Sequence, residues 1–207
     1  MNLRERLLSK PVVYKAFKRV VLPKGNLERI VVEHYRVADG GKVLDLGCGY
    51  GDLARHFSPR CSYLGIDHNA QYIERAKVLN SSNGAVFEVA DLGDPLVAHA
   101  GPFDLVMISG VLHHLADDVA IKLADKVKNV LSATGRFVAM EPVFSPEQGL
   151  IARLTVAADR GRYARDEAGY RALVSPAFVD LTTSIVHDAL RIPYTHIVLS
   201  ASNRSRP

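Results

Sequence analysis

Short apolar runs alternate with amphipathic stretches through the central part of the chain. Nearly continuous apolar runs predict strands, whereas apolar residues that recur every three or four positions predict helices. The helical pattern is clearest at 117–131, where Val119, Leu123 and Val127 share one face, and a second helix is predicted at 69–79. Strands that are apolar on both faces and separated by helices indicate a parallel sheet covered on both sides, hence an α/β fold. The predicted strands are 43–46, 63–66, 85–90, 103–109 and 136–140.

The pattern differs at the two ends of the chain. Before the first strand, apolar positions at helical spacing predict a helical front segment and a further helix at 26–38. After the fifth strand the signal weakens to a helix at 146–158 and a stretch rich in charge and tyrosine at 159–171. Two last strands, 178–188 and 194–201, are joined by a short turn, which predicts an antiparallel pair at the sheet edge. No linker divides the chain, so a single domain is expected.

Glycines gather where the first strand leads into a helix. Gly47, Gly49 and Gly51 lack side chains that would keep a ligand away from the backbone, and a helix start offers free N–H groups. The spacing lacks the third glycine of a dinucleotide-binding loop. Asp45, two residues before the first glycine, would repel a pyrophosphate. It suits a ligand with a positive group, such as an amino-acid ammonium.

Two further strand ends carry an acid. Asp67 follows Gly47 by twenty residues, where a carboxylate can accept both hydroxyls of a ribose. Asp91 ends the third strand, where it can accept from the exocyclic amine of adenine. Any one of these acids could simply cap the helix that follows it. Their joint register with the glycine loop predicts a site for an adenosyl ligand.

These residues resemble those of the class I S-adenosylmethionine (SAM)-dependent methyltransferases, in particular the branch that methylates small molecules. The resemblance implies a Rossmann-like, seven-stranded, mostly parallel sheet with helices on both faces and a C-terminal antiparallel hairpin. It also implies that Asp45 and the glycine backbone hold the methionine end of SAM, Asp67 the ribose and Asp91 the adenine. The motifs that carry it are 43–51 (VLDLGCGYG), 65–67 (GID), 90–92 (ADL) and 103–115 (FDLVMISGVLHHL).

The same resemblance implies how the chain is organised around the cofactor. Residues 1–38 would form a helical cap, 40–140 the cofactor-binding core, 142–180 a substrate-side insertion and 181–201 the final strands. Further residues predicted to line the cofactor site are Cys48, His68, Leu92, Ser109 and, on the front segment, Tyr14.

Methyl transfer from a sulfonium is an in-line displacement, so the protein mainly supplies orientation, a dry site and in some cases a base. His113 follows the fourth strand and can take a proton near neutral pH, or it can pack at the start of the next helix. Glu141 ends the fifth strand and can orient or deprotonate an acceptor, or bond a loop backbone. The arginines of 159–165 suit a carboxylate or phosphate on the acceptor, although a solvated loop explains them equally.

Charge is unevenly spread along the 207 residues, whose net charge is +4. Residues 1–24 hold seven Lys or Arg against the single acid Glu5, which leaves the rest slightly acidic. A solvated helix face, an acidic or lipid-linked acceptor, or peripheral contact with a membrane surface is compatible with this pattern. No nucleic-acid partner is expected, because the wide basic footprint with interleaved aromatics is missing from the sequence.

Cysteine content and hydropathy bear on the cellular compartment of the protein and on whether it binds a metal. Cys48 and Cys61 cannot make a disulfide framework or a four-ligand zinc site, so no metal is predicted. No apolar run reaches the roughly 18 residues of a membrane span, and the first ten residues lack a secretory core. We expect a cytoplasmic protein, and the sequence leaves its oligomeric state open.

Other functions stay open at this point. A nicotinamide-dependent oxidoreductase would also use a strand-end acid such as Asp67, but the missing third glycine and Asp45 disfavour it. A SAM-binding protein without turnover would keep the same motifs. Methylation of bases in nucleic acid is disfavoured because 109–113 lacks the Asn/Asp-Pro-Pro-aromatic pattern.

Overall fold

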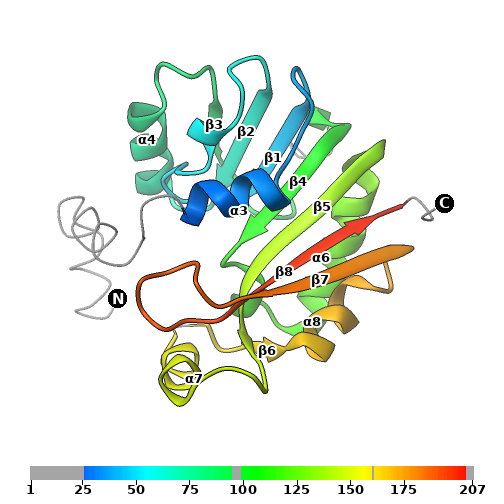
Figure 1. The fold of residues 1–207 in the computed structure, drawn as a ribbon. Coiled ribbons are helices and arrows are strands. Elements are labelled where there is room, and N and C mark those ends of the chain that lie inside the picture. The colour runs from blue at the N-terminus through cyan, green and yellow to red at the C-terminus, as the bar shows by residue number, and fades with distance from the viewer. Residues whose placement is uncertain (1–25, 95–98, 160, 204–207) are drawn as a thin grey trace.

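The computed structural model describes residues 26–94, 99–159 and 161–203, and it contains the predicted parallel sheet (Figure 1). The strand order is β3-β2-β1-β4-β5-β8-β7, in which β1 to β5 are parallel and β8 and β7 are antiparallel. The Rossmann-like α/β fold with a C-terminal hairpin is therefore confirmed. A short further strand, β6, pairs with the end of β5 outside this order. The strands are β1 (Lys42–Leu46), β2 (Ser62–Asp67), β3 (Val86–Val89), β4 (Phe103–Ser109), β5 (Leu131–Phe144), β6 (Arg165–Asp166), β7 (Asp180–Val186) and β8 (His196–Ser202).

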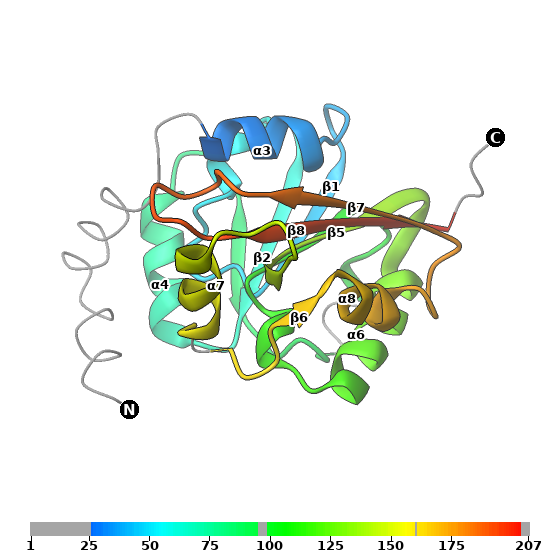
Figure 2. The same ribbon diagram turned by 60° about the horizontal axis from the view of Figure 1, so that its bottom comes forward.

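Helices cover both faces of the sheet, as predicted (Figure 2). One buried cluster joins α6 and α8 to the sheet, and the other joins α3 and α4 to its opposite face. Strand β4 shows the alternation: Val106 and Ile108 belong to the first cluster, whereas Leu105 and Met107 belong to the second. Burial on both faces explains why β4 reads as a continuous apolar run. The four helices are α3 (Asn26–His34), α4 (Ala70–Leu79), α6 (Asp117–Val130) and α8 (Glu167–Val174).

Helix α8 lies in the charged stretch where no helix was predicted. The Asp166 side chain caps it by accepting a hydrogen bond from Gly169 N at 2.8 Å. Tyr170, Leu173 and Val174 are buried at helical spacing, but the charged residues around 165–167 obscure this short pattern. Within the predicted insertion 142–180, α7 (Leu150–Ala157) and β6 lie at the edge where β4 and β5 end (Figure 1), whereas α8 packs against α6.

Two sequence-based expectations remain, namely an N-terminal helical cap and the absence of a membrane-spanning segment. The predicted front helix and Tyr14 fall within residues 1–25, outside the described residues. Among the residues that the structure does describe, no helix combines the length and the apolar character needed to span a bilayer.

Replacing Tyr170 with Phe tests how α8 is held to the sheet. The buried Tyr170 hydroxyl donates to Pro142 O at 2.8 Å, so its removal leaves a buried carbonyl without this partner. We expect the free energy of unfolding in urea to fall by about 1–2 kcal/mol. Tyr163→Phe is the control, because the Tyr163 side chain is exposed. Equal stability of the two variants would contradict the assigned role of this hydrogen bond.

Candidate cofactor and acceptor site

The glycine loop after β1 is shaped by close packing at two glycines and by open space at the third. A Cβ on Gly47 would lie 2.5 Å from Val111 Cγ2, and one on Gly51 would lie 2.5 Å from Phe87 Cε1. All three glycines have positive φ, which disfavours other residues. A Cβ on Gly49 would meet nothing within 4 Å. The backbone at Gly49 therefore faces space that a ligand can fill.

Asp45 is a buried carboxylate beside this loop, with only 2% of its surface exposed. The Tyr63 hydroxyl donates a hydrogen bond to its Oδ2. Burial raises the pKa of Asp45 to about 7, against the lowering effect of Tyr63. A positive group that entered the site would favour the ionised form, so the carboxylate suits an ammonium ligand.

Asp67 ties the end of β2 to the glycine loop. Its Oδ2 accepts from Gly49 N at 3.0 Å, and its Oδ1 accepts from Asn69 N at 2.8 Å. These bonds fix the orientation of the carboxylate at the same sheet edge as Asp45. His68 Nδ1 lies 3.6 Å from Asp67 Oδ1, but the His68 side chain is 80% exposed.

The structure places the other predicted cofactor residues around this edge. Cys48 lies half-buried in the loop, and burial raises the pKa of its thiol. Asp91 and Leu92 follow β3, with Asp91 exposed and Leu92 packed against the core. Ser109 ends β4, where its Oγ lies 3.0 Å from the buried Tyr35 hydroxyl. The predicted cofactor residues that the structure describes therefore lie at or just after the C-terminal ends of four neighbouring strands, β1 to β4.

Glu141 organises the turn after β4 from within β5, because the strand does not end at Glu141 as expected but continues to Phe144 through pairing with β8 and β6. It is fully buried, and its Oε1 accepts from Val111 N at 3.0 Å and from Leu112 N at 2.9 Å. Its Oε2 accepts from His113 N at 3.3 Å and lies 2.7 Å from His113 Nδ1. One carboxylate therefore fixes both the backbone of the turn and the His113 ring.

A second carboxylate occupies the other side of the His113 ring. Asp159 Oδ1 lies 3.1 Å from His113 Nε2, and Asp159 Oδ2 accepts from the Tyr194 hydroxyl at 2.7 Å. Burial opposes a charge on His113, but the bonds to Asp159 and Glu141 outweigh it and raise the pKa of His113 to about 9. The hydrogen bond to His113 holds the pKa of Asp159 well below its usual range. The His113 ring can take a proton from a methyl acceptor only when Nε2 carries no proton and is not paired with Asp159.

Residues 161–165 of the charged stretch lie against this turn. A Cβ on Gly161 would lie 1.8 Å from His113 Cδ2, and Tyr163 N donates to His113 O at 3.0 Å. Arg165 donates to Leu112 O and Leu115 O and pairs with Asp117. Of the arginines that the sequence offered to an acidic acceptor, Arg165 is thus engaged with backbone carbonyls, Arg162 is exposed, and Arg160 lies outside the described residues.

Three residues of the site were missed by the sequence reasoning. Asp159 and Tyr194 carry no local motif that pairs them with His113, because three separate segments meet here. His196 begins β8 with its ring 4.9 Å from that of Tyr194, and its buried Nδ1 has no hydrogen-bond partner among the described residues. Burial lowers the pKa of His196 to about 4, so the ring is neutral at pH 7.

Asp159→Asn tests the charge of His113. The native pKa of about 9 lies above the ordinary 6.5, so the ion pair stabilises the fold below pH 6.5 and loses that contribution as pH rises through about 9. In the variant we expect the His113 pKa, measured by NMR titration of its ring protons, to fall. The stability gap from the parent protein should be large at pH 6.5 and small above pH 9. Asp118→Asn on α6 is the control, and an unchanged His113 pKa in Asp159→Asn would contradict the ion pair.

Comparison with known proteins agrees with this geometry. Residues 43–135 match the family model of a methyltransferase domain. Human N-acetylserotonin methyltransferase, solved in complex with SAM, aligns with a TM-score of 0.68 and 21% identity over 86% of this chain and 52% of that one. This chain thus spans about half the length of the human enzyme.

Two further solved structures share the fold. A putative methyltransferase of Haloferax volcanii, in complex with the activator Trm112, has a TM-score of 0.71 and 13% identity over 95% of this chain and 96% of that one. The mitomycin 7-O-methyltransferase has a TM-score of 0.66 and 16% identity over 94% and 59%. No curated protein sequence matches the chain. Residues 43–135 are therefore similar to a methyltransferase domain, and the chain has the fold of the class I SAM-dependent methyltransferases, the family that its motifs resemble and whose cofactor is SAM.

Proposed function

We propose that the chain binds SAM at the glycine loop and transfers its methyl group to a small molecule. The observation that carries this proposal is the buried Asp45 carboxylate beside the open backbone face of Gly49. A carboxylate with a pKa raised to about 7 gains free energy from a cation in contact with it. That requirement fits the ammonium of the cofactor's methionine end and disfavours the pyrophosphate of a nicotinamide dinucleotide.

The residues present fit the rest of this cofactor. Asp67, held by Gly49 N and Asn69 N, presents a fixed carboxylate to the ribose hydroxyls. Asp91 is exposed just beyond β3, where it would accept from the adenine amine. When bound, SAM supplies a methyl group already activated by a positive sulfur. The protein's own task is then to orient the acceptor, exclude water and hold its proton.

We assign the removal of the acceptor's proton to His113, with Glu141 holding its ring in place. Glu141 holds Nδ1 at 2.7 Å, which leaves Nε2 as the ring nitrogen that would face an acceptor. Asp159 occupies Nε2 in this structure, so His113 would act as a base only after Asp159 separates from it. Glu141 is a positioning residue in this scheme. A SAM-binding protein without turnover remains the second candidate, because both ring nitrogens are engaged.

The names of two similar proteins support a small molecule as the methyl acceptor. N-acetylserotonin and mitomycin are the acceptors in the names of two of them, although neither exceeds 25% identity to this chain. Methyl transfer from labelled SAM into a metabolite extract would separate an enzyme from a protein that only binds the cofactor. Label in a macromolecular fraction alone would contradict the small-molecule assignment.

Asp45→Asn tests the cofactor site directly. The change keeps the size of the side chain and removes the charge that would meet the ammonium. We expect calorimetry to show that S-adenosylhomocysteine and SAM bind the parent protein and bind Asp45→Asn about tenfold more weakly or worse. Asp118→Asn, an exposed acid on α6, is the matched control and should bind as the parent does. Failure of both ligands to bind the parent protein would overturn the proposed function.

Proton release gives an independent test of Asp45. Because its pKa in the ligand-free protein is about 7, ligand binding at pH 7 should release about half a proton as Asp45 ionises fully. Affinity for S-adenosylhomocysteine should weaken about fivefold from pH 7 to pH 6, where more of Asp45 is protonated. Calorimetry in buffers with different ionisation enthalpies measures the release. Equal release by the parent and by Asp45→Asn would contradict this assignment.

A further inference from the structure

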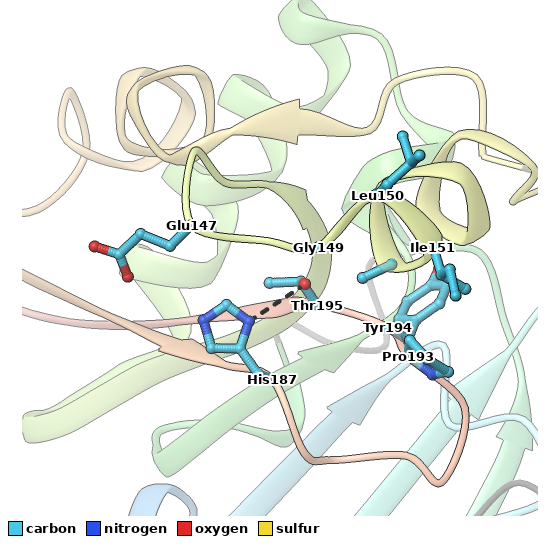
Figure 3. Close-up of a pocket in the computed structure, with 9 residues that line it drawn as sticks. Glu147, Gly149, Leu150, Ile151, His187, Pro193, Tyr194 and Thr195 are labelled. Carbon is cyan, nitrogen blue, oxygen red and sulfur yellow. Dashed lines mark hydrogen bonds between the residues drawn. The ribbon is translucent and has the colours of Figure 1, made fainter.

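A pocket of about 490 Å³ lies between the start of α7 and the segment that joins β7 to β8 (Figure 3). Its volume falls within the roughly 300–1,000 Å³ of small-molecule sites. Leu150 and Ile151 of α7 and Pro193 and Tyr194 of the joining segment form its apolar walls. Figure 3 shows Leu150 and Ile151 at one end and Glu147 and His187 at the other. None of these residues belongs to the cofactor site described above.

Tyr194 connects this pocket to the reacting edge of the sheet. Its side chain lines the pocket, and its hydroxyl donates to Asp159, which in turn contacts His113. His113 follows Val111, whose Cγ2 would lie 2.5 Å from a Cβ on Gly47 in the cofactor loop. The chain of contacts from the glycine loop to the pocket is therefore continuous. A molecule in the pocket would lie on the acceptor side of His113.

The side chains that form the α7 wall of the pocket are largely exposed to solvent. Leu150 is 73% exposed and Ile151 is 66% exposed, although both line the pocket. Leu154 lies one turn further along α7, is 60% exposed and does not line the pocket. Clustered exposed apolar side chains mark a surface that gains free energy when a ligand covers it. The position of Leu150 and Ile151 in the pocket favours a compact ligand over a broad partner surface.

The charge of the pocket favours one class of ligand. Among the described lining residues the one carboxylate is Glu147, none is Lys or Arg, and the one histidine, His187, lies 3.4 Å from Thr195 Oγ1 through its Nδ1. Arg165 at the His113 turn is committed to Leu112 O, Leu115 O and Asp117. Arg153 of α7 and Arg191 of the joining segment are exposed and do not line the pocket. An anionic ligand would therefore meet a carboxylate without a compensating cation from these residues.

We propose that this pocket holds the methyl acceptor, and that the acceptor has a compact apolar body and is neutral or cationic rather than anionic. The proposal rests on the proposed methyl transfer for the role of the ligand. The existence and charge preference of the pocket rest only on its own residues. Binding to the pocket can therefore be tested without turnover.

Three small phenols that share one ring and differ in the charge of the tail provide the test: 4-ethylphenol, tyramine and 4-hydroxyphenylacetate. We expect ligand-observed NMR, with and without S-adenosylhomocysteine, to show binding of the neutral and cationic probes. The anionic probe should bind at least about threefold more weakly, as the Coulomb interaction with a surface carboxylate allows. Glu147→Lys should reverse this order, whereas Glu74→Lys on α4 should leave it unchanged.

Paired leucine variants locate the bound probe. Leu150→Ala should weaken 4-ethylphenol binding about threefold or more, because it removes apolar contact from the pocket wall. Leu154→Ala removes another largely exposed leucine of α7 that lies outside the pocket, and it should have no effect. An equal loss in both variants would show that the whole helix face binds the probe, and it would overturn the assignment of the pocket.

The other possible outcomes test the pocket assignment and the methyl-transfer function separately. The proposal fails if 4-hydroxyphenylacetate binds the parent protein as tightly as the other probes, or if no probe binds while S-adenosylhomocysteine does. In the second case methyl transfer as the function would stand and only the pocket assignment would fall. If the probes bind as expected and neither SAM nor S-adenosylhomocysteine binds, the pocket stands as a ligand site and the methyl-transfer function fails.

Discussion

The buried carboxylate of Glu141 is the constraint on which the proposed acceptor side of this molecule depends. A fully buried charge must be met by hydrogen bonds, and Glu141 receives them from three successive backbone N–H groups and from the His113 ring. These bonds join the C-terminal part of β5 to the turn after β4. The His113 ring that they fix then receives Asp159 on its other nitrogen. Tyr163 N then donates to His113 O, and the Tyr194 hydroxyl donates to Asp159.

Much of the fold was predictable because its signals are local and repeated. Strand β4 is buried on both faces, so its apolar run is unbroken, and α6 shows one apolar stripe over its whole length. Helix α8 was missed because its eight residues offer few buried positions to show a pattern, and charged residues surround its start. The greater length of β5 was missed because its first and last residues gain strand geometry from neighbouring strands rather than from their own pattern.

The two halves of the candidate site, which we propose for the cofactor and for the acceptor, differed in the same way in how far the sequence predicted them. The cofactor half lies at the ends of successive strands, so Asp45, the glycines and Asp67 could be placed together from their spacing. The acceptor half brings together residues that are far apart in the sequence, such as His113, Asp159 and Tyr194. No spacing rule connects them, because tertiary packing alone determines that they meet. His113 and Glu141 were singled out from strand ends, and their shared hydrogen bond became visible only in the structure.

Asp45 has a consequence for discrimination among adenosine compounds. ATP and related nucleotides carry the same base and sugar as the proposed ligand, so contacts to those groups alone could not distinguish them. Their phosphates would approach a buried carboxylate that already resists ionisation in the ligand-free protein. Selectivity against nucleotides would then come from the sign of one charge near the end of β1 rather than from contacts to the base and the sugar.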